Sequence, residues 1–226
     1  MPSLQARPPE RRPIPARGWR SAQALAGWLA HRGVSPNAIS IAGMLCGLGA
    51  GAALAGTSLA PSYERLAWLT AAALILLRAA ANMLDGMVAV EFARSSPVGE
   101  LYNEVPDRVS DAVMQIALGY AADGVPWLGY TAACAALLVA YVRAVGKAAG
   151  VPQEFGGPMA KQRRMFTVVA LGLYLGLAPH NWQPRWGSPP AVGLAAAASA
   201  VILLGCVWTI LWRLKRIALA LQHRGA

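Results

Sequence analysis

Long apolar blocks decide what kind of protein this chain can form. Residues 38–57 and 191–212 consist almost entirely of apolar or small side chains, and each has about the 20 residues that an α-helix needs to cross the hydrocarbon core of a bilayer. Apolar residues make up 56% of the chain and charged residues only 13%, which argues against a soluble domain. The blocks lack the two-residue alternation of membrane barrel strands. The sequence therefore predicts an all-α, polytopic membrane protein.

Gly, Pro and polar residues divide the apolar blocks into six predicted transmembrane helices. The fifth is short unless it takes in part of the basic segment before it. Gly43, Gly47 and Gly51 repeat every four residues and predict close packing of the first helix. We expect one transmembrane domain over residues 33–217 and a cytoplasmic tail at 218–226. The predicted spans are residues 38–57, 66–88, 105–122, 127–146, 165–178 and 191–212.

Two segments of different character precede the first span. Residues 1–16 mix five prolines with three arginines, which prevents a continuous helix, so we expect a disordered basic arm. Residues 17–32 place Trp19, Leu25 and Trp28 near helical spacing, with basic and polar residues between them. This pattern predicts an amphipathic helix that lies in the headgroup region. A short soluble helix that caps the bundle is the alternative.

The chain carries a net charge of +10, but its Lys and Arg residues lie between the apolar blocks. That distribution is typical of topology signals and of contact with anionic lipid, so it argues against a nucleic-acid partner. Six spans put both termini on one side, which receives seventeen of the twenty basic residues; Arg65 and Arg185 fall on the other side and Arg78 inside a span. We therefore expect both termini in the cytoplasm and the protein in a bacterial inner membrane.

Six of the ten acidic residues gather in one short stretch, where the predicted second span ends and the third begins. They are Asp85, Glu91, Glu100, Glu104, Asp107 and Asp111. Residues three or four apart share one face of a helix, so Asn103, Asp107 and Asp111 form a polar stripe. Asn82 and Asp85 form a second stripe on the preceding helix. Carboxylates at a membrane boundary are costly and commonly hold a cation or move a proton.

Oxygen-bearing side chains on two adjoining helices, next to basic groups, are typical of sites where a hard divalent cation is shared with substrate phosphates. Mg²⁺ or Mn²⁺, as one or two ions, neutralises phosphate charge, while a spare carboxylate takes a proton from an attacking hydroxyl. The pattern indicates phosphoryl-group chemistry on a lipid or a nucleotide-linked substrate. Candidates to hold further phosphate oxygens are Arg143, Lys161, Arg163 and Arg164.

The same stretch resembles the signature of the CDP-alcohol phosphatidyltransferase family, which reads D-x-x-D-G-x-x-A-R-x8-G-x3-D-x3-D. Residues 82–107 fit its spacing without a gap. Matching positions are Asp85, Gly86, Ala89, Gly99 and Asp107. Upstream, residues 36–40 (Pro-Asn-Ala-Ile-Ser) resemble the Pro-Asn-x-x-Thr sequence that enters the family's first span. The six-span layout and the amphipathic N-terminal helix agree as well, so the resemblance covers nearly the whole chain.

The resemblance implies a metal-dependent enzyme of phospholipid biosynthesis, with its catalytic domain in the membrane. Such an enzyme displaces CMP from a CDP-linked donor, often CDP-diacylglycerol, by the hydroxyl of a small alcohol or lipid acceptor. The family's metal ligands correspond by position to Asn82, Asp85, Asn103 and Asp107, and the last of these is also the general base. The residues implied at the nucleotide are Pro36, Asn37, Gly86, Ala89 and Gly99.

The chain departs from the motif at three positions. Asn82 and Asn103 replace the first and third aspartates, and Val90 replaces the arginine. An amide oxygen can ligate a hard ion but brings no negative charge. The acids expected to compensate are Glu91, Glu104 and Asp111. We predict a divergent but active transferase; the alternatives are a homologue that binds nucleotide or lipid without turnover and an ion-coupled transporter. Small-residue helix faces are compatible with a homodimer, and the sequence does not identify the acceptor.

Overall fold

The computed structural model describes residues 15–92, 98–187 and 191–225, and within these ranges the chain forms seven α-helices. They are α1 (Arg20–His31), α2 (Pro36–Leu59), α3 (Glu64–Glu91), α4 (Gly99–Tyr120), α5 (Pro126–Ala148), α6 (Lys161–Leu177) and α7 (Leu194–Gly225). The smaller elements are 3₁₀ helices at Pro15–Gly18, Pro61–Tyr63 and His180–Trp182 and an antiparallel hairpin of β1 (Arg185–Trp186) and β2 (Val192–Gly193). The predicted all-α class is confirmed; the short hairpin was not predicted. The predicted arm at 1–16 lies almost entirely outside the described residues.

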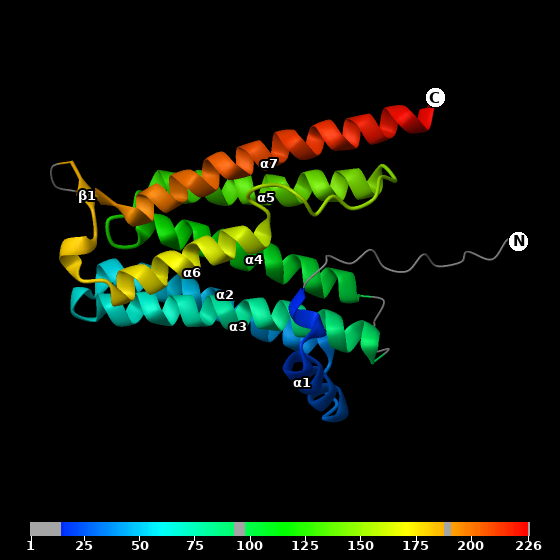
Figure 1. Cartoon of the computed structure of the whole chain (residues 1–226), viewed down its shortest axis with the longest axis horizontal. Helices are drawn as coiled ribbons and strands as arrows, with labels where there is room; N and C mark the ends of the chain where they lie inside the picture. The colour runs from blue at the N-terminus through cyan, green and yellow to red at the C-terminus, as the bar shows by residue number, and fades with distance from the viewer. Residues whose placement is uncertain (1–14, 93–97, 188–190, 226) are drawn as a thin grey trace, which may run out of the picture.

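The long helices α2 to α7 run along one common axis, and α1 lies across one end of the bundle (Figure 1). α2 packs against α3 and α4, α5 packs against α4 and α7, and α6 packs against α3. The β-hairpin lies at the opposite end from α1 (Figure 1). The end of α3 and the end of α7 lie at the same end as α1 (Figure 1). The acidic stretch is therefore placed at the α1 end.

Four segments of the described chain are long and apolar enough to cross a bilayer. These are Pro36–Leu59, Pro61–Glu91, Pro126–Ala148 and Leu194–His223. α4 carries much of the acidic stretch and α6 has only 17 residues, which sets both apart from those four. Large apolar side chains on the outer surface, among them Leu77, Leu138 and Leu204, are exposed, as expected where lipid rather than water surrounds the helices. The chain is a polytopic helical membrane protein.

Two helix ends differ from the sequence-based expectation. α4 begins at Gly99, ahead of the predicted start of the third span, so Asn103 and Glu104 lie on the helix itself. Glu100 in the first turn favours this early start, because a negative charge stabilises the positive end of the helix dipole. α7 continues beyond the predicted sixth span to Gly225, since no Pro or Gly interrupts that part of the sequence. Most of the predicted tail is therefore helical.

The glycines of α2 let α4 lie directly against it. A Cβ atom at Gly47 would lie 2.6 Å from the Cβ of Ser110, and one at Gly51 would lie 2.5 Å from Cγ1 of Val113. Either distance is far inside van der Waals contact, so a larger residue would push the helices apart. The predicted packing role of this repeat is confirmed, and the close approach brings the polar face of α4 next to α2.

A close backbone approach joins α4 to α5 and gives a stability prediction. A Cβ atom at Gly129 would lie 2.8 Å from the carbonyl oxygen of Gln115 and 2.9 Å from Cα of Gly119, both main-chain atoms that cannot rotate away. Overpacking of this kind costs about 1–3 kcal/mol. We expect Gly129→Ala to lower the midpoint of thermal unfolding in detergent by several degrees, at about 2–4 °C per kcal/mol for a chain of this size.

Gly56→Ala is the matched control, because no described atom lies within 4 Å of the position its Cβ would take. Alanine is favoured over glycine inside a helix by about 0.5–1 kcal/mol, so this variant should melt at the wild-type temperature or slightly above it. Equal midpoints for the two variants would contradict the assigned contact between α4 and α5.

Candidate active site

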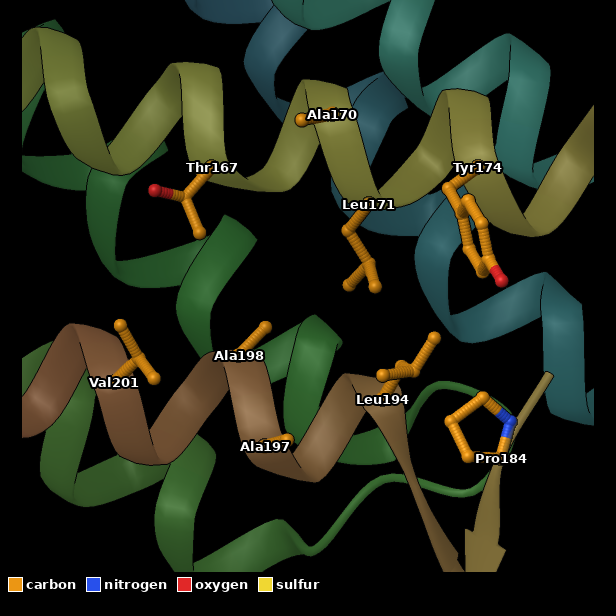
Figure 2. A pocket seen from close by; sticks show the side chains of 9 residues that line it. All are labelled: Thr167, Ala170, Leu171, Tyr174, Pro184, Leu194, Ala197, Ala198 and Val201. Carbon is orange, nitrogen blue, oxygen red and sulfur yellow. The ribbon is translucent and has the colours of Figure 1, made fainter.

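The structure has an apolar groove and a cavity lined by charged residues. A groove between α6 and α7, shown in Figure 2, has a volume of about 460 Å³ and is lined by residues such as Leu171, Leu194 and Val201, with no charged side chain among its nine lining residues. A cavity of about 1020 Å³ lies toward the α1 end and takes its walls from α2 to α7. This second hollow, called the polar cavity below, holds most of the predicted site residues.

Asp85 forms the α3 wall of the polar cavity. Its Oδ2 accepts a hydrogen bond from Ser40 Oγ at 2.7 Å and its Oδ1 accepts one from the backbone N–H of Gly86 at 2.6 Å. Ser35 caps the N-terminus of α2 and thereby fixes the turn that carries Ser40. A Cβ atom at Gly86 would lie 3.4 Å from the guanidinium of Arg17. The N-terminal segment therefore closes over this wall.

Asp107 on α4 joins three helices. Its Oδ1 accepts from Arg78 Nη2 of α3 at 3.2 Å, and its Oδ2 pairs with Lys161 of α6. Asn82, with its amide turned to suit its neighbours, donates to Asp107 Oδ1 at 3.1 Å and accepts from Arg78 at 2.8 Å and from Lys161 at 2.5 Å. Arg78, which falls inside a predicted span, has Asp107 as its partner, because α4 places that carboxylate level with Arg78.

Asp111 lies one turn further along α4, away from the cavity wall. Its Oδ2 pairs with Arg164 Nη2 at 2.6 Å, and both side chains are 1% exposed. Arg164 also donates to the carbonyl oxygen of Met159 at 2.8 Å. The predicted metal ligand Asp111 and the predicted phosphate ligand Arg164 therefore hold each other in a buried ion pair, although part of Arg164 borders the cavity.

Two ion pairs connect α4 to α5 on the cavity wall. Glu104 Oε1 accepts from Arg143 Nη2 at 2.6 Å, and Glu100 pairs with Lys147. Glu104 Oε2 also accepts from Arg108 Nη2 at 3.3 Å. The predicted compensating acid Glu104 is thus part of the cavity but is held by arginines. All five side chains line the polar cavity.

The remaining predicted residues divide into two groups. Glu91 is exposed at the last residue of α3, and Arg163 is exposed and donates to the carbonyl oxygen of Pro158 at 3.3 Å. Neither residue lines the polar cavity. The predicted residues that do line it, beyond those already described, are Pro36, Asn37, Ala89, Gly99 and Asn103.

Among the cavity-lining residues that sequence reasoning missed are Arg17, Trp19, Ser40 and Lys147. Ser40 occupies the Thr position of the Pro-Asn-x-x-Thr pattern, and that position was a usable signal. Lys147 lies one helical turn after Arg143, so it shares the face of a residue that was predicted. Arg17 and Trp19 carried no such signal, because their place depends on how the N-terminal segment folds back.

The oxygen donors of the polar cavity suit one hard divalent cation. Asp85 and Asp107 supply carboxylates, Asn82 and Asn103 supply amide oxygens and Ser40 supplies a hydroxyl. In the described part of the chain, His, Cys, Asp and Glu residues form no cluster of three or more that could hold a metal. Carboxylate and amide oxygens are ligands of hard divalent cations, so these residues fit Mg²⁺ or Mn²⁺.

Comparison with known proteins places the chain among lipid-synthesis enzymes. Residues 33–212 match the model of the CDP-alcohol phosphatidyltransferase family. The archaetidylinositol phosphate synthase of Aeropyrum pernix is 27% identical over 199 residues, which cover 88% of this chain and 91% of that protein. The phosphatidylinositol phosphate synthase of Streptomyces avermitilis is 24% identical over 198 residues, which cover 85% of this chain and 75% of that protein.

Two solved structures of the phosphatidylinositol phosphate synthase of Mycobacterium tuberculosis share the fold. The structure with CDP-DAG bound has a TM-score of 0.67 at 18% identity and covers 88% of this chain and 94% of that one. The structure in complex with manganese and citrate has a TM-score of 0.66 at 18% identity and covers 87% of this chain and 88% of that one. The helical architecture described above is therefore the architecture of those enzymes.

Proposed function

The chain belongs to the CDP-alcohol phosphatidyltransferase family, and on that premise we propose that it moves a substituted phosphate group from a CDP-alcohol to the hydroxyl of an acceptor alcohol, with release of CMP. The observation that carries this proposal is that Asp85 of α3 and Asp107 of α4 line one cavity. A helix pair that directed these carboxylates to different sides would leave no place for a diphosphate between them.

The donor is CDP-diacylglycerol and the acceptor is a phosphorylated polyol. A solved relative binds CDP-DAG, and three of the similar curated proteins are archaetidylinositol or phosphatidylinositol phosphate synthases. Arg143, Lys147 and Lys161 place three basic groups on the cavity wall, which suits an acceptor that itself carries phosphate. The nucleotide lies against Pro36, Asn37, Gly86, Ala89 and Gly99.

The transfer is a displacement at phosphorus. The acceptor hydroxyl oxygen bonds to the phosphorus that bears the diacylglycerol, and the bond from that phosphorus to the bridging oxygen breaks, so CMP leaves with the electron pair. Asp107 accepts the hydroxyl proton, because its carboxylate lies on the cavity wall. Mg²⁺ or Mn²⁺ would be held by Asp85 and Asp107 with amide oxygens of Asn82 and Asn103, and it would neutralise the diphosphate charge.

Six helices, α2 to α7, span a bacterial inner membrane with the polar cavity on the cytoplasmic side. The excess of basic residues at that end supports this orientation. α1 lies in the headgroup layer, since Trp19 and Trp28 are 65% and 53% exposed beside basic residues. The predicted homodimer stays a prediction.

The test is an assay of CMP release by the purified protein in lipid micelles that contain CDP-diacylglycerol, with and without Mn²⁺ and with inositol phosphate or glycerol phosphate as the acceptor. We expect release that depends on both metal and acceptor, together with a new phosphate-containing lipid detected by mass spectrometry. Binding of CDP-diacylglycerol without any release would favour the alternative of a homologue without turnover. If the protein neither binds CDP-diacylglycerol nor releases CMP, the proposal is refuted.

A further inference from the structure

We propose that the polar cavity holds one divalent cation, and that the ammonium of Lys161, supported by Arg78, occupies the place that a second ion would take. The inference rests on the proposed function for its ligand class, a divalent cation shared with a diphosphate. It concerns the number of ions bound, which can be measured without turnover.

The first argument is charge. The motif that this chain resembles brings four carboxylates to the site, whereas Asn82 and Asn103 reduce them to Asp85 and Asp107. Lys161 and Arg78 already add two positive charges next to Asp107. These two cations already offset the charge of Asp107, so Asp85 is the carboxylate left to hold one divalent ion before any substrate binds. A second divalent ion would add two positive charges with no protein group left to offset them.

The second argument is the position of the ammonium. Lys161 pairs with Asp107 Oδ2 and lies 2.5 Å from the amide oxygen of Asn82. These two side chains stand at the fourth and first aspartate positions of the motif. The ammonium therefore bridges two groups that would otherwise be free to share an ion. Its side chain is 14% exposed and lines the cavity, so it meets the substrate side directly.

The third argument is that Arg78 is built into the fold. Its side chain is 1% exposed and lies behind the cavity wall, where it donates to Asp107 Oδ1 and to the Asp107 carbonyl oxygen, both at 3.2 Å. Space for its stem exists because residue 47 is glycine: a Cβ there would lie 3.0 Å from Arg78 Cδ. Asp107 is therefore held by fixed cations at both of its oxygens.

Asp85 differs from Asp107 in the groups that surround its carboxylate. Among the described residues its hydrogen-bond donors are neutral, the Ser40 hydroxyl and the Gly86 N–H. No basic group of the described segments forms a direct ion pair with it, and it lines the cavity. Asp85 is the anchor for the single ion, and Asp107 has the smaller share in holding it.

The experiment counts bound Mn²⁺ on the purified full-length protein in detergent, without substrate, by the electron paramagnetic resonance signal of the free ion. We expect one Mn²⁺ per wild-type chain. The variant Asn82→Asp/Lys161→Met restores a carboxylate and removes the ammonium, and we expect it to bind two Mn²⁺ whose mutual coupling broadens the six-line spectrum. Lys215→Met is the control, since Lys215 is exposed on α7 outside the cavity wall, and it should keep one ion.

Two ions or none on the wild-type chain would overturn the proposal, and so would a folded double variant that still binds one. If the double variant does not fold, the wild-type count decides alone. The result is separable from the proposed function: one bound ion without CMP release refutes the transfer and leaves the one-ion site in place. CMP release with two bound ions refutes the one-ion site and leaves the proposed transfer in place.

Discussion

Replacing Asp107 by Asn is expected to slow CMP release by about 10²- to 10⁴-fold, the range that a positioned general base contributes. The amide keeps the shape of the side chain but cannot take the proton of the acceptor hydroxyl. Because the lost interaction belongs to the transition state, kcat should fall while KM for CDP-diacylglycerol changes little. The measurement is initial-rate CMP release at saturating Mn²⁺ with varied donor.

Two controls separate the loss of a base from a general disturbance. Glu154→Gln removes an acid that pairs with Arg216 and lies outside the cavity wall, so its rate should stay within about twofold of wild type, as is usual for surface changes. The thermal midpoint of Asp107→Asn shows whether the variant is folded, since Arg78 loses its carboxylate partner. A folded Asp107→Asn with more than a tenth of the wild-type rate would show that Asp107 serves only to hold Arg78 and Lys161.

The motif spacing was enough to predict that the two carboxylates at its second and fourth aspartate positions share a cavity. Asp85 and Asp107 lie 22 residues apart, on two helices that the sequence separated by a turn at the right place, and both line the polar cavity. The spacing works because a helix repeats every 3.6 residues, so the polar stripes on α3 and α4 could be drawn without coordinates. The number of membrane spans was harder to predict, because α4 and α6 are less apolar than the four long apolar helices.

The partners of the buried arginines could not be predicted from local pattern. Arg78 pairs with Asp107 because α2 packs against both α3 and α4 and sets their relative depth, as the contacts of Gly47 with Ser110 and Arg78 show. α6 begins at Lys161, so residues three apart share its inner face and Arg163 points outward. The sequence treated these basic residues as one group because the start of the helix was placed too late.

A large loss of stability is expected from Asp111→Asn. The change leaves the guanidinium of Arg164 without its counter-ion at a site where both side chains are 1% exposed. Removal of one partner from a buried ion pair costs about 3–5 kcal/mol. For a chain of this size that corresponds to a fall of roughly 6–20 °C in the midpoint of thermal unfolding, measured in detergent by circular dichroism.

Two comparisons decide whether Asp111 acts through Arg164 or through a metal, the role that the sequence suggested. Asp123→Asn breaks a pair with Arg185 whose side chains are 27% and 51% exposed, so it should cost less than about 1 kcal/mol. The double variant Asp111→Asn/Arg164→Met should recover part of the lost stability, because no unpaired charge stays buried. If Asp111→Asn instead keeps the wild-type midpoint and loses Mn²⁺ binding, Asp111 is a metal ligand and the buried pair is incidental.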